Sequence, residues 1–274
     1  MNKFTFFGTP KVASETLAYL LAHGFTPSLV VTSPDAPQGR GLVLTPSPTK
    51  VLALEHGIQA MTPEKLDETT IREIQDFKCD YALVVAYGKI FPESLIAAFP
   101  KGVLNVHYSL LPKYRGATPM ESALLAGERE TGVTIQKMVK ELDAGDIIAQ
   151  ESVEIGSDET ARELRPRLID LGAEMLVKTL PQYLKGEISP VQQDASLATR
   201  APKIKKEQGE LNLNVDGVTN WNKYRAYADT IGTYFFKDGK RTKVVKASFK
   251  NGLFTIERII PEGKREMDYA DTER

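Results

Sequence analysis

The sequence predicts a mixed α/β fold, with a Rossmann-like, mostly parallel sheet flanked by helices and a small C-terminal β domain. Over roughly the first 150 residues, short apolar segments alternate with helical patterns, as in parallel sheets covered on both faces. After a polar connector, strand-like segments are separated by the turns Asp238-Gly239 and Asn251-Gly252. We therefore expect a large domain at 1–193, a linker at 194–208 and a β domain at 209–274.

The strands of the large domain are expected at short apolar segments. Tyr81–Val85 is wholly apolar, which is typical of a central strand buried on both faces. Val103–His107 is similar but ends in polar residues. In order, strands are expected at residues 3–7, 28–32, 81–85, 103–107 and 133–138, followed by a hairpin-like stretch at 147–155.

Helices are expected where apolar residues recur at helical spacing. In the first of them, Leu17, Leu20 and Leu21 lie on one face. The second begins at Ser47-Pro48, because serine caps helix N-termini and proline fits the first helical position. The expected helices cover residues 14–22, 48–56, 118–125, 160–184 and 219–228.

The connection between the second strand and the second helix is unusually long. Residues 33–46 include three prolines and two glycines. Connections in α/β folds usually have about two to six residues, and much longer ones are more often functional. We therefore expect a functional loop here.

The net charge of −1 conceals an uneven distribution along the chain. Residues 201–274 have 15 basic and 11 acidic side chains, whereas residues 1–200 have 20 basic and 25 acidic ones. A basic C-terminal part on an acidic body is compatible with a polyanionic partner. A solvated basic surface explains the same distribution equally well.

Several classes of protein are disfavoured. Cys79 is the only cysteine, so no intramolecular disulfide can form, and the chain starts directly with a strand-like segment. No apolar stretch approaches the roughly 18 residues of a membrane span. These features predict a cytoplasmic protein. The three histidines and the cysteine show no zinc-binding spacing, so no metal is expected.

The histidines differ in their sequence context. His23 and His56 each precede a glycine at an expected helix C-terminus, where an imidazole complements the helix dipole. His107 instead follows Asn105 by two residues at the carboxyl end of an expected central strand. Ligands of open α/β sheets bind at that end, and alternation places both side chains on one face.

Two loops would lie at the same edge of the sheet. Residues 109–116 contain proline and glycine at positions where the chain must change direction, and residues 142–146 place Asp143 and Asp146 around a glycine. Asp143 would orient the His107 imidazole, although a solvated turn explains the same acids. No serine or cysteine has a nucleophile context, and the first turn lacks the glycines of a dinucleotide site.

Five segments together resemble the folate-dependent formyltransferases. They are residues 6–10 (FFGTP), 84–88 (VVAYG), 105–116 (NVHYSLLPKYRG), 131–135 (TGVTI) and 142–146 (LDAGD). The loop 35–41 with 46–48, and residues 201–204, resemble more narrowly the branch of the family that acts on methionyl initiator tRNA. The resemblance covers about the first 210 residues and implies the formyltransferase fold for the large domain.

The resemblance implies that a formyl group passes from 10-formyltetrahydrofolate, the co-substrate, to the α-amine of methionyl initiator tRNA. Asn105, His107 and Asp143 would be the catalytic residues. An amine that attacks a formamide-like carbonyl forms a tetrahedral oxyanion, which requires hydrogen-bond donors rather than a covalent nucleophile. In the family, folate is surrounded by the segments that match Tyr87, Gly88, Ser109, Leu110, Leu111 and Pro112.

The family also implies contacts with tRNA. Arg40 in the long loop would pair with phosphate or stack on a base, although a solvated arginine between glycines is the alternative. Lys203, Lys205 and Lys206 in the connector would follow the phosphate backbone, together with lysines further along the β domain.

The chain departs from the family pattern in its C-terminal part. The β domain is shorter than the barrel of the OB type found in the family, so either an abbreviated barrel or a small open sheet is expected. An open sheet edge would allow two copies to pair as a homodimer. Two alternatives remain: a formyltransferase for a nucleotide-linked amino sugar, and a catalytically silent RNA- or folate-binding protein.

Overall fold

The computed structural model describes residues 2–39 and 41–272. Its contacts divide the chain into two compact units. The first unit comprises the chain up to Arg115 together with residues 132–151 and 168–199. The second comprises residues 116–131 and 152–167 and the chain from Arg200 onward. The domain boundaries expected from the sequence, at residues 193 and 208, stay a prediction.

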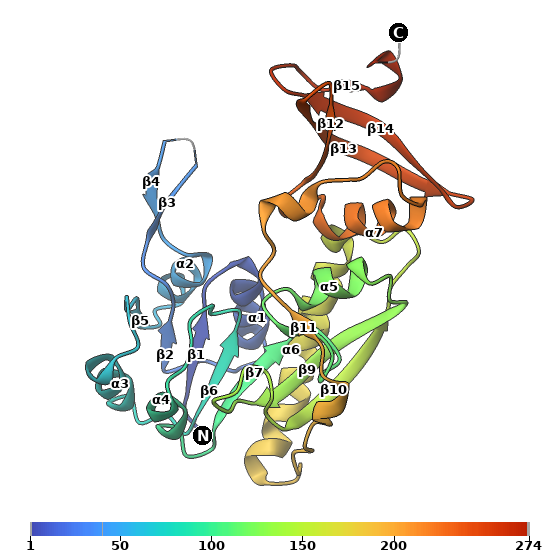
Figure 1. Cartoon of the computed structure of the whole chain (residues 1–274). Helices are drawn as coiled ribbons and strands as arrows, with labels where there is room; N and C mark the ends of the chain where they lie inside the picture. The colour runs from blue at the N-terminus through green and yellow to red at the C-terminus, as the bar shows by residue number, and fades with distance from the viewer. Residues whose placement is uncertain (1, 40, 273–274) are drawn as a thin grey trace. The chain divides into compact units, whose positions relative to one another are not determined.

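A seven-stranded sheet forms the centre of the first unit, in the order β10-β9-β7-β6-β1-β2-β5 (Figure 1). Five strands run parallel: β1 (Phe4–Gly8), β2 (Leu29–Val31), β5 (Ala60–Met61), β6 (Tyr81–Val85) and β7 (Val103–His107). β9 (Glu130–Lys137) is antiparallel to β7, and β10 (Ile147–Glu154) forms the edge beside β9. The mixed α/β prediction is confirmed, but residues 147–154 form one long strand rather than a hairpin.

Helices lie on both faces of this sheet (Figure 1). Local capping fixes where two of them begin: the Ser47 side chain accepts a hydrogen bond from the Lys50 amide, and that of Asp67 accepts one from the Thr70 amide. The helices are α1 (Lys11–Ala22), α2 (Pro48–Glu55), α3 (Glu68–Gln75), α4 (Glu93–Ala97) and α6 (Ala161–Lys185), of which α6 contributes residues to both units. A short 3-10 helix, η1 (Ala195–Leu197), follows α6.

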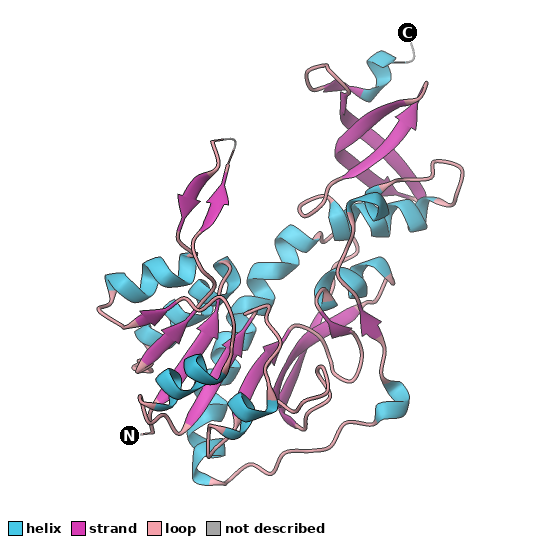
Figure 2. Ribbon diagram, turned by 60° about the vertical axis from the view of Figure 1, so that its left-hand side comes forward, coloured by secondary structure: helices cyan, strands magenta, loops and turns pink. Residues whose placement is uncertain are grey.

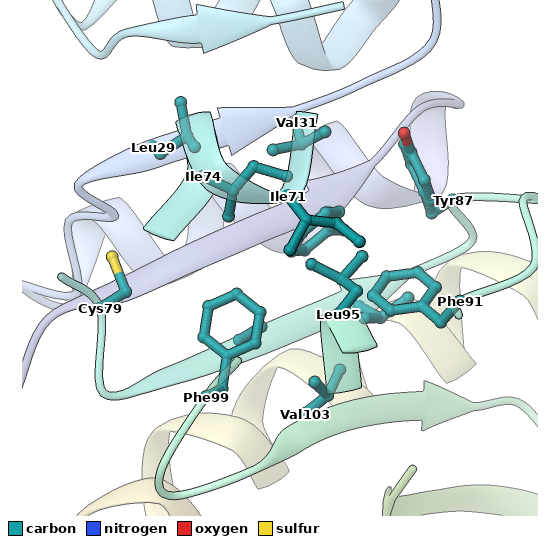
Figure 3. Close-up of a cluster of buried hydrophobic side chains, with 13 residues drawn as sticks. Leu29, Val31, Ile71, Ile74, Cys79, Tyr87, Phe91, Leu95, Phe99 and Val103 are labelled. Atoms are coloured by element: carbon teal, nitrogen blue, oxygen red, sulfur yellow. The ribbon is translucent and has the colours of Figure 1, made fainter. Parts of the chain in front are cut away.

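One face of the sheet packs against α3 and α4 through a buried apolar cluster. Figure 3 shows Ile71 and Ile74 of α3 and Leu95 of α4 beside side chains from the strands. The other face lies close to α6, because a Cβ added at Gly172 would be 3.1 Å from Val106. Alternation in β7 therefore directs Val106 toward α6 and its neighbours Asn105 and His107 to the opposite face.

The long connection after β2 is not an irregular loop. Ala36–Gln38 (β3) pairs antiparallel with Val43–Thr45 (β4), and Figure 2 shows the two strands as a hairpin that projects from the sheet. Its apolar side chains are unusually open to solvent, with Leu42 72% exposed. The sequence did not indicate these strands, because each has only three residues and prolines and glycines typical of loops surround them. Arg40 lies outside the described residues.

The second unit contains a four-stranded antiparallel sheet in the order β12-β13-β14-β15. Its strands are β12 (Thr233–Lys237), β13 (Lys240–Lys250), β14 (Leu253–Pro261) and β15 (Met267–Asp268), and its helices include α5 (Pro119–Leu125) and α7 (Gly217–Tyr227). Trp221 and Tyr224 of α7 stack with ring centroids 5.6 Å apart and share a buried cluster with Phe235 and Val244. The short elements are β8 (Arg115–Gly116), β11 (Arg200–Ala201), η2 (Lys206–Gly209) and η3 (Tyr269–Thr272).

The described strand order of the C-terminal sheet is linear, which corresponds to the open-sheet alternative. β15 pairs with β14 at Arg258 and Ile259. A homodimer formed through this sheet stays a prediction. Across the described residues, no helix combines the length and the apolar character needed to cross a membrane.

Candidate active site

The polar residues predicted at the end of β7 lie beside two polar residues of β9. In the antiparallel register, Asn105 pairs with Gln136 and His107 pairs with Thr134. Residues that pair across two strands direct their side chains to the same face. Four polar side chains therefore share one face at this end of the sheet.

The same face changes from apolar to polar across the sheet. Phe7 of β1 pairs with Val84 of β6, which pairs with Asn105 of β7, which pairs with Gln136 of β9. Phe7 and Val84 belong to the buried cluster under α3 and α4. The polar half of this row thus begins where the apolar packing ends, so the sheet supports the site with a rigid core.

His107 is held by a hydrogen bond at one ring nitrogen, and its other ring nitrogen lies near a carboxylate. The residue is only 5% exposed, its Nε2 is 2.9 Å from the Tyr114 carbonyl oxygen, and its Nδ1 is 3.7 Å from Asp143 Oδ1. A carbonyl oxygen only accepts hydrogen bonds, so Nε2 must be the protonated nitrogen of the ring. Nδ1 is then the nitrogen available for proton exchange on the side of the carboxylate.

Asp143 lies on a loop with an uncommon backbone conformation. Its φ is +50°, in the left-handed region that non-glycine residues rarely adopt. Its Oδ1 accepts a hydrogen bond of 2.9 Å from Gln136 Nε2, which fixes the carboxylate beside His107. The structure therefore brings His107 and Asp143 together, with Asn105 on the same face of β7.

Gln136 is a site residue that sequence reasoning missed. It is buried, and its Oε1 has no hydrogen-bond partner among the described residues. Alternation along the predicted strand 133–138 could have placed Gln136 on one face with Thr134, but nothing in the sequence paired this strand with β7. A buried amide oxygen without a partner is unfavourable, and a bound water molecule that donates a hydrogen bond would satisfy it.

The loop after β7 is fixed by its own hydrogen bonds. Ser109 Oγ donates to the Lys113 carbonyl at 2.7 Å, and Thr134 Oγ1 donates to the Ser109 carbonyl at 2.6 Å. The Leu111 amide donates to Thr134 Oγ1, and the Leu111–Pro112 peptide is cis. Ser109 and Leu111 are buried, whereas Leu110 and Pro112 are half-buried. Among these predicted folate contacts, Leu110 and Pro112 therefore have surface that a ligand can reach.

Tyr87 and Gly88 follow β6 at the same end of the sheet. The Tyr87 ring packs edge-on against Phe7 and Phe91 in the apolar cluster, and burial raises the pKa of Tyr87 to about 12. Its hydroxyl is buried without a partner in the described part of the chain. Gly88 is exposed with a φ of +81°, so only its backbone can contact a ligand.

The residues predicted to contact RNA are not among the polar residues at the end of β7 and β9. Lys203, Lys205 and Lys206 belong to the second unit and are exposed. Arg40, as noted, is not described. No group of three or more His, Cys, Asp or Glu side chains in the described ranges is arranged to hold a metal ion.

The sequence as a whole matches known proteins. The model of the formyl transferase family matches residues 2–180. This chain belongs to the formyl transferase family. Its relatives include methionyl-tRNA formyltransferases from Halalkalibacterium halodurans, 41% identical over 88% of this chain and 77% of that protein, and from Dictyoglomus thermophilum, 38% identical over 97% and 94%. The family resemblance inferred from the sequence is thereby confirmed.

Solved formyltransferases share the fold at lower identity. An N-formyltransferase from Helicobacter canadensis, solved with folinic acid and dTDP-3-aminofucose, superposes with a TM-score of 0.72 at 20% identity, over 98% of this chain and 99% of that one. A methionyl-tRNA formyltransferase from Clostridium thermocellum gives 0.63 at 16% identity, over 95% and 99%. At these identities the likeness establishes the formyltransferase fold.

Proposed function

We propose that this formyl transferase moves a formyl group from 10-formyltetrahydrofolate to the α-amine of methionyl initiator tRNA, a step in translation initiation. The observation that carries the proposal is the similarity to methionyl-tRNA formyltransferases at about 40% identity over most of the chain. The polar group formed by Asn105, His107 and Asp143 supplies the chemistry that this reaction needs.

The reaction proceeds without a covalent enzyme intermediate. The amine nitrogen attacks the formyl carbon, and the carbonyl oxygen becomes an oxyanion. The new C–N bond forms, the bond from carbon to the folate nitrogen breaks, and one proton passes from the amine to the departing folate nitrogen. Asn105 donates an amide N–H to the oxyanion, which stabilises the charge where it develops.

His107 and Asp143 transfer the proton that the attacking amine loses. The Nε2–H bond to the Tyr114 carbonyl holds the ring, so Nδ1 is the position for proton transfer. Nδ1 takes the amine proton and then delivers it to the departing folate nitrogen, and Asp143 Oδ1, 3.7 Å from Nδ1, stabilises the imidazolium that exists in between. Gln136 holds the carboxylate in place through the hydrogen bond to the same Oδ1.

The folate co-substrate is assigned to the loops around this group. Leu110 and Pro112 provide accessible surface, while Ser109 and Leu111 shape the loop from inside. The exposed backbone of Gly88 faces no neighbouring atom within 4 Å of an added Cβ, so it leaves room for a ligand. Tyr87 would act through its backbone, because its ring belongs to the core.

The tRNA contacts are assigned to Lys203, Lys205 and Lys206, together with Arg40, which lies between the β3 and β4 segments in the sequence. We expect simultaneous substitution of the three lysines by alanine to raise KM for tRNA several-fold with little change in kcat, because phosphate contacts contribute to binding rather than to chemistry. The slope of log affinity against log salt should fall in magnitude by about 2 to 3. Filter binding over a series of salt concentrations measures this slope. The triple arginine variant, which keeps the charge, should retain the slope; a slope unchanged by alanine would contradict the assignment.

A nucleotide-linked amino sugar is the second candidate acceptor. It is favoured by the fold shared with the Helicobacter canadensis enzyme, whose chain is covered almost completely. The projecting hairpin β3–β4 argues against a small acceptor, because such an acceptor gives no reason for it. The intact catalytic group argues against a silent protein.

One assay distinguishes these functions. The protein is supplied with 10-formyltetrahydrofolate and either charged initiator tRNA or an amino sugar nucleotide. We expect formylmethionyl-tRNA to form and the sugar to remain unmodified. Formylation of the sugar alone would overturn the proposed acceptor, and no transfer to either compound would support a silent binding protein.

A further inference from the structure

The segment that follows α6 returns to the site and runs along it. Val191 forms an isolated antiparallel bridge with Ile147, with both backbone hydrogen bonds at 2.8 Å. In antiparallel pairing, residues two positions beyond the bridge on one strand lie opposite residues two positions before it on the other. Gln193 therefore comes to lie opposite Gly145, on the loop that contains Asp143.

The other end of this segment is attached to the loop after β7. The Arg115 amide donates to the Thr199 carbonyl at 2.8 Å, and the Tyr114 amide donates to Thr199 Oγ1 at 2.8 Å. Tyr114 is also the residue whose carbonyl binds His107. The segment 191–199 is thus pinned to both loops of the catalytic site.

The side-chain amide of Gln193 bonds both to the loop that contains Asp143 and to Arg115 after β7. It is 7% exposed, and its Nε2 donates to the carbonyl oxygens of Asp143 at 3.0 Å and Gly145 at 2.7 Å. Its Oε1 accepts from Arg115 Nε at 3.1 Å and Nη2 at 2.7 Å. The loop 142–146, here called the acid loop, accepts hydrogen bonds from both N–H groups of the amide, and the buried Arg115 guanidinium donates to its oxygen.

We propose that Gln193 is a positioning residue for formyl transfer, which holds Asp143 at His107 by fastening the acid loop to Arg115. The inference rests on the proposed function, because it takes Asp143 as a participant in proton transfer. Gln193 does not touch the reacting atoms. It acts through the backbone of Asp143, whose left-handed conformation needs support from the surrounding structure.

The chemistry of this position requires a carboxamide. Arg115 offers only donors, and the two loop carbonyls are only acceptors, so the side chain between them must accept on one side and donate on the other. A glutamate keeps the size and the bond to Arg115 but cannot donate to the loop. It also places negative charge beside two carbonyl oxygens. The substitution therefore breaks the attachment to the loop 142–146 while the attachment to Arg115 remains.

The test uses Gln193→Glu in the full chain, with Gln192→Glu as the matched control. Gln192 is the exposed neighbour, so the control makes the same chemical change next to the site. We expect Gln193→Glu to lower kcat about tenfold, less than the roughly hundredfold loss that a catalytic group displaced by about 1 Å can cause, because the substitution loosens the loop without forcing it to move. Affinity for folinic acid and KM for the acceptor should stay within about twofold of wild type. The control should match the wild type.

A double-mutant cycle separates positioning from a general loss of stability. If Gln193 acts through Asp143, then Gln193→Glu should cost little further turnover in an Asp143→Asn background, whereas unrelated losses would multiply. Multiplied losses, or wild-type kcat in Gln193→Glu, overturn the inference. So does wild-type kcat in Asp143→Asn.

Amide hydrogen exchange provides a readout that does not depend on activity. Peptides covering residues 142–146 should exchange faster in Gln193→Glu than in the wild type and the control, because the loop has lost two hydrogen bonds. Unchanged exchange overturns the inference even if the proposed transfer is confirmed. Faster exchange in Gln193→Glu, together with no formyl transfer by the wild-type protein, would instead overturn the proposed function and leave the loop attachment established.

Discussion

Replacing His107 by alanine should reduce formyl transfer by a factor on the order of 10² to 10⁴, the usual contribution of a general acid or base. His107 is the buried imidazole between the Tyr114 carbonyl and the Asp143 carboxylate. Without it, the site has no group at this position to exchange the amine proton. Single-turnover measurements with charged initiator tRNA give the chemical step directly.

The same variant should bind folate with nearly unchanged affinity. The loop that contains the predicted folate contacts at residues 109–112 is held by hydrogen bonds of Ser109 and Thr134 rather than by His107. Fluorescence titration with folinic acid measures this. His56→Ala is the matched control, because His56 is an exposed residue at the C-terminal end of α2. Near-normal turnover of the His107 variant would remove the role assigned to it.

Replacing Gly145 by alanine should lower turnover roughly a hundredfold, as displaced catalytic groups can do. An added Cβ would overlap the Lys137 carbonyl oxygen and come within 2.8 Å of the Lys137 carbonyl carbon. Backbone atoms cannot rotate away as a side chain can, so the acid loop must move and take Asp143 with it. Such crowding also destabilises the fold, by about 1 to 3 kcal/mol.

Gly156→Ala is the control for this prediction. Its added Cβ would lie 3.4 Å from the Glu159 Cβ, which is an ordinary contact. Activity and the midpoint of thermal unfolding should both stay close to wild type. Turnover comparable to wild type in Gly145→Ala would show that the position of the acid loop does not limit the reaction.

The sequence predicts the central strands well because burial leaves a clear pattern. Residues 81–85 and 103–107 are strands with the expected bounds: the first is continuously apolar because both of its faces are covered, and the second keeps apolar residues at 103, 104 and 106. The hairpin β3–β4 was missed, because each of its strands has only three residues and the surrounding prolines and glycines are typical of loops. The edge strand β5, with only two residues, leaves no periodic signal at all.

The candidate site could be predicted only in part. Asn105 and His107 stand at the end of a recognisable strand, where ligands of α/β proteins bind. Gln136 and Gln193 gave no signal, because glutamine is common on surfaces and their partners depend on long-range pairing. Gln193 reaches Asp143 only through the bridge between Val191 and Ile147, which no local pattern reveals.

The alternation of β7 has a consequence for how this enzyme can vary. Along the strand, Asn105 and His107 alternate with Leu104 and Val106, which are buried in the core. Inserting or deleting one residue within β7 would reverse the faces of the residues that follow it, so that polar side chains of the site would face the apolar packing against α6 and aliphatic side chains would face the substrates. Folding and catalysis would fail in one event, so length changes in this strand should be lethal to the enzyme even where point substitutions are tolerated.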